Sequence, residues 1–303
     1  MILNDAVAHF YSYLLTEQRV ARNTFDAYKH DMERFVTFVS HQNGESVDAA
    51  GTLLKHFLKT LKDSGLSART VARTISCLRT FFNYLEKRHN LENQALSLII
   101  PKLEKKLPRF LNEKEVEALL EKASEDMTEI GRRNSVMLHL LYATGMRVSE
   151  LISVKITHID FSTGLLKVSG KGGKERIVPL PQTIVSLLSL YVRELLPLFL
   201  HREGTILITD YLFPTYYDEM LKPMTRQCFW LYVKKIAKEA SITSELSPHQ
   251  LRHSLATHLL KNGSDLRSLQ MLLGHEQLRT VQVYTHTEIS HLRKIYDMKH
   301  PRS

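Results

Sequence analysis

The sequence is poor in the residues that build disulfide-bonded or zinc-bound proteins. Its 303 residues include only two cysteines, Cys77 and Cys228, which lie far apart in the chain. A disulfide scaffold is therefore not expected, and zinc-finger spacing is absent. The low cysteine content fits a protein of the reducing cytoplasm.

Long apolar segments are also missing. The chain has no uninterrupted apolar run of about 18 residues, so no membrane span is expected. The first residues, Met1–Asp5, lack the basic segment followed by an apolar stretch that marks a secretion signal. What remains is a globular balance of 43% hydrophobic and 24% charged residues, in a chain long enough for two ordinary domains.

Positive charge is in excess. The formal net charge is +9 and the sequence pI is about 9.4, which favours a polyanionic partner, most commonly nucleic acid. The excess is concentrated: residues 51–100 contain eight Lys or Arg against three Asp or Glu. A concentration of this kind is what a DNA-binding face requires.

Residues 1–98 have the pattern of a helical domain. Asn23 and Ser67 are predicted to cap two helices, because a polar side chain there precedes apolar residues at steps of three and four. Arg69, Arg73 and Arg79 fall largely off the apolar stripe of the second helix. They form either an ordinary solvated face or a cationic face for DNA phosphates.

Prolines then interrupt the pattern. The charged segment Pro101–Arg109 is bracketed by two prolines and predicts an inter-domain linker over residues 101–110. The chain thus divides into an N-terminal helical domain, 1–100, and a larger domain, 111–303. Asn112 is expected to open the first helix of the larger domain, with Glu115 as its capping-box partner.

The larger domain is predicted to be mainly helical, with one β-hairpin. Residues 164–169 and 175–180 resemble strands, and the Gly-rich segment 170–174 between them suits a turn. This segment is not a nucleotide-binding loop, because it lacks the P-loop spacing and does not lead into a helix. The predicted fold class is therefore mainly α with a small β-sheet in the second domain.

The segment Ser247–His253 has features of a phosphate-binding helix start. Ser247 suits an N-cap, Pro248 suits the first helical position, and His249 and Arg252 then share one face of the first turn. A histidine, a guanidinium and a helix N-terminus together can bind a phosphate, although an ordinary capped helix has the same pattern.

A zinc site is a further possibility to consider for this helix. His249 and His253 have the four-residue spacing of a zinc pair. However, Gln250 stands where a metalloprotease helix needs a glutamate, and the spacing suggests no third ligand. Metal catalysis is therefore disfavoured, and no metal or other cofactor is expected.

Two more breaks place polar residues at helix ends. Gly145 allows a turn before Arg147, and Gly274 ends a helix before His275, with Tyr284 nine residues later. Taken singly, Arg147 is typical of a surface residue, and Tyr284 is typical of a core or surface residue.

In combination these residues resemble the tyrosine recombinase (phage integrase) family. The resemblance covers the whole chain, and residues 247–260 and 265–275 look like its bacterial Xer branch. The ending Met298–Arg302 is closer to the D-type than to the C-type subunit of that branch. The departures, Met146 and Leu255, fall outside the matching catalytic positions. Those positions are Arg147, Lys171, His249, Arg252, His275 and Tyr284.

The resemblance implies a reaction in which the Tyr284 hydroxyl attacks a DNA phosphodiester and leaves a 3′-phosphotyrosyl bond. Arg147 and Arg252 are then expected to clamp the non-bridging oxygens, which gain charge in the transition state. Glu150 and Glu175 fit supporting roles, such as orienting an arginine or a lysine. One phosphodiester replaces another, so no nucleotide cofactor is needed.

The resemblance also assigns the proton transfers. His249 is expected to act as the base that activates the phenol, because a free tyrosine is protonated at neutral pH. Lys171 is the candidate acid for the leaving 5′-oxygen, with Lys174 as an alternative. His275 is expected to hydrogen-bond the phosphate.

The implied architecture is a two-domain C-shaped clamp around duplex DNA, with four protomers exchanging strands between two sites. Resolution of chromosome dimers is the implied role, with a related recombinase and a septal DNA translocase as partners. A mobile-element integrase or a type IB topoisomerase remains an alternative, as do a non-enzymatic DNA-binding protein and a metal nuclease. Docking onto a neighbouring protomer, or packing within the same domain, is expected for the apolar residues Ile289, Leu292, Ile295 and Tyr296.

Overall fold

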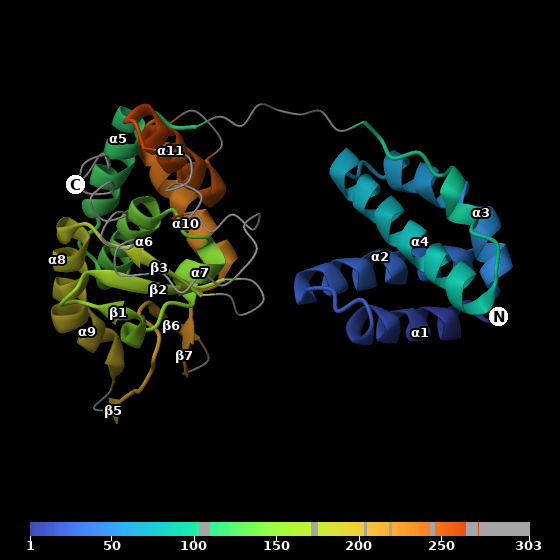
Figure 1. Cartoon of the computed structure of the whole chain (residues 1–303), viewed down its shortest axis with the longest axis horizontal. Coiled ribbons are helices and arrows are strands. Elements are labelled where there is room, and N and C mark those ends of the chain that lie inside the picture. Colours follow the sequence, from blue (N-terminus) through green and yellow to red (C-terminus); the bar gives the residue numbers. More distant parts are fainter. Residues whose placement is uncertain are drawn as a thin grey trace. The chain divides into compact units, whose positions relative to one another are not determined.

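The computed structural model describes residues 1–102, 110–170, 175–202, 205–217, 220–242, 246–264 and 272. The chain separates into two compact units, Met1–Lys106 and Leu107–Ser303 (Figure 1). Most of the predicted linker, residues 103–109, lies outside the described residues. Both units are mostly helical, and small antiparallel sheets occur in the larger one.

The smaller unit is built from helices, of which α4 contacts the other three long ones (Figure 1). Its core contains aromatic and aliphatic side chains from every long helix. The described helices are α1 (Leu3–Thr16), α2 (Arg22–His41), α3 (Val47–Asp63), α4 (Ala68–His89) and the short 3-10 helix η1 (Gln94–Ser97).

The apolar stripes of α2 and α4 face this core, as the sequence predicts. Met32, Phe35 and Val39 of α2 are fully buried. The start of α2 differs from the prediction: Ala21 is the N-cap, and Asn23 lies inside the first turn. The backbone at Ala21 is extended and no side chain caps the helix. The polar residue Asn23 therefore did not mark the start of α2.

Helix α4 begins where it was predicted to begin. The Ser67 hydroxyl accepts a hydrogen bond from the Thr70 N–H at 3.2 Å. Arg79 donates to the Leu98 carbonyl at 2.6 Å, and Arg73 forms two 2.9 Å hydrogen bonds to Asp31 of α2. Two of the three arginines on the outer face of α4 therefore have partners within the unit, whereas Arg69 is exposed.

The larger unit is arranged around α6, which packs against α5, α7, α8, α10 and α11. Contact on so many sides explains why nearly all of its second half is buried. The helices of this unit are α5 (Glu113–Ser124), α6 (Glu129–Thr144), α7 (Val148–Ile152), η2 (Ile156–His158), α8 (Gln182–Leu190), η4 (Tyr191–Leu195), α9 (Leu196–Leu200), α10 (Arg226–Glu239) and α11 (Pro248–Lys261).

Three antiparallel strands form the main sheet, in the order β1-β2-β3. The predicted hairpin is confirmed: β2 pairs with β3 from Leu165↔Pro179 to Ser169↔Glu175. The strands are β1 (Ile159–Asp160), β2 (Leu165–Ser169) and β3 (Glu175–Pro179), with two separate short pairs, β4 (His201–Arg202) with β5 (Thr205–Ile206) and β6 (Pro214–Tyr217) with β7 (Met220–Pro223).

The predicted caps of α5 and α11 are also confirmed. Asn112 and Glu115 form a reciprocal capping box, with hydrogen bonds of 2.9 and 2.8 Å between side chain and backbone. Pro248 is the first residue of α11, and the Gln250 side chain accepts from the Ser247 N–H at 2.6 Å.

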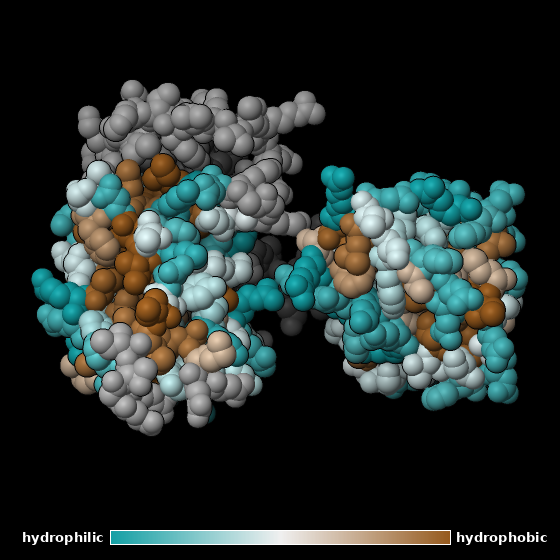
Figure 2. Space-filling view, turned by 90° about the horizontal axis from the view of Figure 1, so that it is seen from below, coloured by the Kyte–Doolittle hydropathy of each residue, from teal (hydrophilic) through white to brown (hydrophobic). Residues whose placement is uncertain are grey.

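One helical stretch, Gln182–Leu200, has the length and composition of a membrane span, with a mean hydropathy of 1.6. It comprises α8, the π-helical turn η4 and α9, and its inner side chains, including Leu188 and Tyr191, belong to the core. Arg193 and Glu194 are exposed on its outer side. Packing of this stretch against α6 therefore accounts for part of its apolar character. Apolar side chains also gather on one face of the larger unit (Figure 2).

The ion pair between α2 and α4 predicts an asymmetric effect on stability. The Asp31 side chain is 1% exposed and the Arg73 side chain 42%. Arg73→Ala should lower the free energy of unfolding by about 2–3 kcal/mol, because it leaves a buried carboxylate without its partner. Urea denaturation measures this loss. The double variant with Asp31→Ala should be more stable than Arg73→Ala alone, and Arg69→Ala should change stability by less than about 0.5 kcal/mol. Equal losses in the two arginine variants would contradict the argument.

Candidate active site

Arg147 lies at the break between α6 and α7, as predicted. Helix α6 ends at Gly145, whose left-handed backbone (φ 57°) lets its N–H donate to the Leu141 carbonyl at 2.9 Å. Arg147 then serves as the N-cap residue of α7. The turn places its side chain, which is 41% exposed, outside the core.

Glu150, in the first turn of α7, binds Arg147 twice. Its carboxylate accepts from the Arg147 backbone N–H at 2.7 Å and from the Arg147 Nη1 at 3.0 Å. The Glu150 side chain is only 3% exposed, so the carboxylate is a fixed partner for the guanidinium. The supporting role expected for Glu150 matches this geometry.

Arg176 of β3 completes the pairing of Glu150, and the sequence interpretation missed it. Its Nη1 and Nη2 bind the two carboxylate oxygens at 3.0 and 2.8 Å, and its Nε donates to the Leu272 carbonyl at 3.2 Å. Arg176 was detectable in principle, because it lies on the same face of the strand as buried Val178 and opposite buried Val168.

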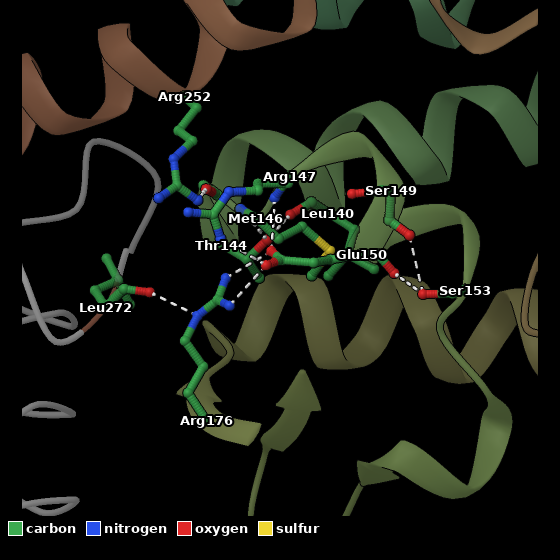
Figure 3. A network of polar contacts seen from close by, with 11 residues as sticks. Leu140, Thr144, Met146, Arg147, Ser149, Glu150, Ser153, Arg176, Arg252 and Leu272 are labelled. Atoms are coloured by element: carbon green, nitrogen blue, oxygen red, sulfur yellow. Dashed lines mark hydrogen bonds and ion pairs between the residues drawn. The ribbon is translucent and has the colours of Figure 1, made fainter. Parts of the chain in front are cut away.

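Arg252, in the first half of α11, extends to the turn between α6 and α7 that holds Arg147. Its Nη1 donates to the Gly145 carbonyl at 2.6 Å. Burial, and then the positive charges of Arg147 and Arg176, lower the pKa of Arg252 from 12.5 to about 10. Figure 3 shows the Arg147 and Arg252 guanidiniums next to each other, with Arg176 on the far side of Glu150.

The electrostatic balance of this cluster favours an anion. Three guanidiniums and one carboxylate give it a formal charge of +2. Burial by itself would raise the pKa of Glu150, but hydrogen bonds from Arg176 and from the Arg147 backbone, with the Arg176 charge, lower it to about 2. Glu150 is therefore ionised at neutral pH, and the mutual repulsion of the arginines is what a bound phosphate oxygen would relieve.

The other predicted site residues are described in part or not at all. His249 lies in the first turn of α11, three residues before Arg252, but its side chain is outside the described atoms. Lys171, His275 and Tyr284 are outside the described residues, as is the alternative acid Lys174. Leu272, which precedes His275 by three residues, is buried and hydrogen-bonded to Arg176.

Glu175 lies apart from the arginine cluster in its contacts. It pairs with Lys167 at 2.8 Å on the outer side of the hairpin, where both side chains are about half exposed. Among the described residues it binds Lys167 and Ser169, so it supports a lysine and not an arginine of the cluster. Over the described part of the chain, no three His, Cys, Asp or Glu side chains come together as metal ligands would.

The depressed pKa of Glu150 predicts a pH-dependent contribution to stability. Since the pKa is about 2 in the folded protein and 4.5 ordinarily, the contribution is complete above pH 4.5 and is lost as pH falls toward 2. Glu150→Gln should therefore cost about 3 kcal/mol at pH 7, and this cost should shrink by about 2 kcal/mol at pH 3. Urea unfolding of both proteins from pH 7 to pH 3 measures the change, and a pH-independent difference would contradict it.

Comparisons with known proteins agree on one family. The model of the phage integrase family matches residues 109–291, and that of the phage integrase N-terminal SAM-like domain matches residues 7–89. The tyrosine recombinase XerD of Staphylococcus saprophyticus subsp. saprophyticus is 38% identical over 304 residues, covering 99% of this chain and 100% of that protein. XerD of Staphylococcus aureus has the same identity and coverage.

Solved structures give the same result. A crystal structure of the XerH site-specific recombinase bound to its difH substrate, a pre-cleavage complex, is 26% identical with a TM-score of 0.66, covering 91% of this chain and 77% of that one. A dimer of lambda integrase (75–356) bound to a COC′ core site has a TM-score of 0.65 and 18% identity, covering 93% and 100% of the two chains, and supports the fold alone. The chain therefore belongs to the phage integrase family and is a tyrosine recombinase.

Proposed function

We propose that this tyrosine recombinase cuts and rejoins DNA at specific sites through a covalent bond between Tyr284 and a 3′-phosphate. The observation that supports it best is the pair Arg147 and Arg252, which two different helices hold side by side around Gly145. Both positions match the arginines that the sequence resemblance assigns to the phosphate.

The two arginines are suited to the transition state of this reaction. A phosphodiester is already anionic, and charge builds on its non-bridging oxygens as the tyrosine oxygen attacks. Each guanidinium offers paired N–H donors to those oxygens, and Glu150 and Gly145 fix the two donors before DNA arrives. Preorganised donors of this kind are usually the largest single contribution to such a rate.

The remaining roles follow from the chemistry of the residues at the matching positions. His249 takes the phenol proton of Tyr284, Lys171 or its neighbour Lys174 protonates the leaving 5′-oxygen, and His275 hydrogen-bonds the phosphate. His249 lies in the first turn of the helix that holds Arg252, and Leu272, three residues before His275, accepts a hydrogen bond from Arg176. Both facts support a site at this cluster.

No nucleotide or metal is required by the proposed reaction. The phosphotyrosyl bond conserves the energy of the phosphodiester that it replaces, so a 5′-hydroxyl from another strand can attack it directly. Exchange between two duplexes is then recombination, whereas return of the original strand only reseals the nick.

We assign the two domains to residues 1–100 and 111–303 and propose that they close around duplex DNA as a C-shaped clamp. Four protomers would assemble on two sites, as a homo-tetramer or with a related recombinase. XerH has been solved bound to its difH substrate, and lambda integrase has been solved as a tetramer bound to a Holliday junction, which supports DNA as the partner and assembly on it. The whole-length similarity to XerD favours resolution of chromosome dimers in the cytoplasm, with a septal DNA translocase as a further partner.

Tyr284→Phe should abolish the covalent adduct and leave DNA binding unchanged, because only the attacking oxygen is removed. The substrate is a nicked duplex with the sequence that the protein itself selects from a random DNA pool. A denaturing gel detects the adduct, and a mobility-shift assay measures binding. An adduct formed by the variant would show that another residue is the nucleophile.

A plasmid with two copies of the selected site distinguishes the alternatives. Recombination between the sites supports the proposal, whereas relaxation of supercoils without exchange would indicate a topoisomerase. Wild-type protein that binds but never forms an adduct would indicate a DNA-binding protein without this activity.

Arg147→Ala should slow adduct formation by about 100- to 1,000-fold, because one preorganised donor to the transition state is lost. Its preference among DNA sequences should be unchanged, because a phosphate contact reads no base. Single-turnover cleavage measures the first effect and competition binding the second. Arg193→Ala, which removes an exposed arginine from η4, is the matched control and should cleave at the wild-type rate.

A further inference from the structure

A buried hydrogen-bonded chain connects α6 to α11 next to the arginine pair. The Tyr142 hydroxyl lies 2.9 Å from Nδ1 of His258, and the two side chains are 2% and 1% exposed. Nε2 of His258 lies 2.8 Å from the Leu111 carbonyl. A carbonyl can only accept, so Nε2 carries the hydrogen and Nδ1 accepts from the tyrosine.

The start of the larger unit is fastened to the same helix. The Leu111 N–H donates to the Ser254 hydroxyl at 2.8 Å, and that hydroxyl donates to the Gln250 carbonyl at 2.8 Å. Both backbone groups of Leu111 are thereby bound to α11. The imidazole of His258 is fixed between a backbone carbonyl and a phenol, and its burial lowers its pKa, which keeps it neutral.

The location of this chain relates it to the arginines. Tyr142 lies one helical turn before Gly145, whose carbonyl binds Arg252, and Arg147 follows two residues later. His258 lies six residues after Arg252 on α11. The distance between the two guanidiniums depends on how α6 and α11 are aligned, and the Tyr142–His258 bond joins these two helices without using either arginine.

We propose that Tyr142 and His258 form a positioning pair that holds Arg147 and Arg252 at the separation required by the scissile phosphate. This inference rests on the proposed function, in which both arginines bind that phosphate. A Phe–Leu pair of similar volume would fill the same space, but apolar contacts permit sliding, whereas a buried hydrogen bond specifies one alignment. Displacement by about 1 Å at an active site can cost about 100-fold in rate.

The test compares two buried tyrosines of the larger unit. Tyr191 of η4 is 1% exposed, and its hydroxyl donates to the Leu212 carbonyl at 3.0 Å, so Tyr191→Phe loses the same kind of buried bond, but one that does not join α6 to α11. Tyr142→Phe should form the adduct with nicked, self-selected DNA about 10-fold more slowly at saturating DNA, with binding affinity within twofold of wild type. Tyr191→Phe should lower Tm to a similar degree and cleave at the wild-type rate.

A second pair of variants separates position from stability. The amide of His258→Gln can donate to Leu111 and accept from Tyr142, so this variant should keep at least about half of the wild-type rate. His258→Leu fills the space without either bond and should be about 10-fold slower. Equal rates for these two variants, or for Tyr142→Phe and wild type, would overturn the positioning role.

The control for the proposed function is the wild-type protein itself. If the wild type forms the adduct and Tyr284→Phe does not, the proposed function stands whatever the Tyr142 and His258 variants do. If wild-type protein forms no adduct, the proposed function fails, and the positioning role falls with it. The two failures are therefore distinguishable in one set of assays.

Discussion

The Glu150 carboxylate is the interaction on which the arrangement of the site depends. Glu150 is the carboxylate that pairs with buried Arg176 in the part of the chain that the structure describes, and a buried cation without a counter-charge costs several kcal/mol. The same carboxylate orients Arg147 through a guanidinium bond and a backbone bond. Through Arg176 it also reaches the Leu272 carbonyl. One anion thus connects α7, strand β3 and the backbone that leads to His275.

The arginines around Glu150 differ in exposure, and this difference separates a structural arginine, Arg176, from those proposed to bind the phosphate. The Arg176 side chain is 8% exposed and donates hydrogen bonds to the Glu150 carboxylate and the Leu272 carbonyl, so its role is to hold parts of the protein together. Arg147 is 41% exposed, and its contact with Glu150 leaves guanidinium donors for a ligand. Arg252 is held close to both positive charges, which is unfavourable without an anion. Under the proposed function, a DNA phosphate bound at the cluster would relieve this repulsion.

Local structure was predictable where a short segment determines it. Ser67, Asn112 and Pro248 mark helix starts because their side chains or rings act on the backbone within one turn. The Gly-rich hairpin was predictable for the same reason. Asn23 failed because α2 begins after Ala21 without a side-chain cap, and only packing against the other helices can set such a boundary.

Long-range pairing could not be read in the same way. Glu150 and Arg176 are 26 residues apart, and Arg252 is 107 residues from Gly145. A charged residue beside a turn is usually exposed, so Arg176 was overlooked, although the strand pattern places its side chain on the buried face. The resemblance to a family supplied the positions of Arg147 and Arg252, and the sequence also suggested a supporting role for Glu150. The pairing of Glu150 with Arg176, and of Arg252 with the Gly145 carbonyl, required the fold.

The histidine of α11 extends this argument from the charged part of the site to its neutral support. His258 follows buried Leu251 and Leu255 at helical spacing, so its inward direction was detectable from the pattern. Its partner Tyr142, 116 residues away, was not. In the proposed function each guanidinium of the site has two partners: Arg252 binds the Gly145 carbonyl and the phosphate, and Arg147 binds Glu150 and the phosphate. The Tyr142–His258 bond is buried and neutral and has no part in binding the phosphate. In the proposed role it serves only to hold α6 and α11, and with them the two arginines, in one alignment.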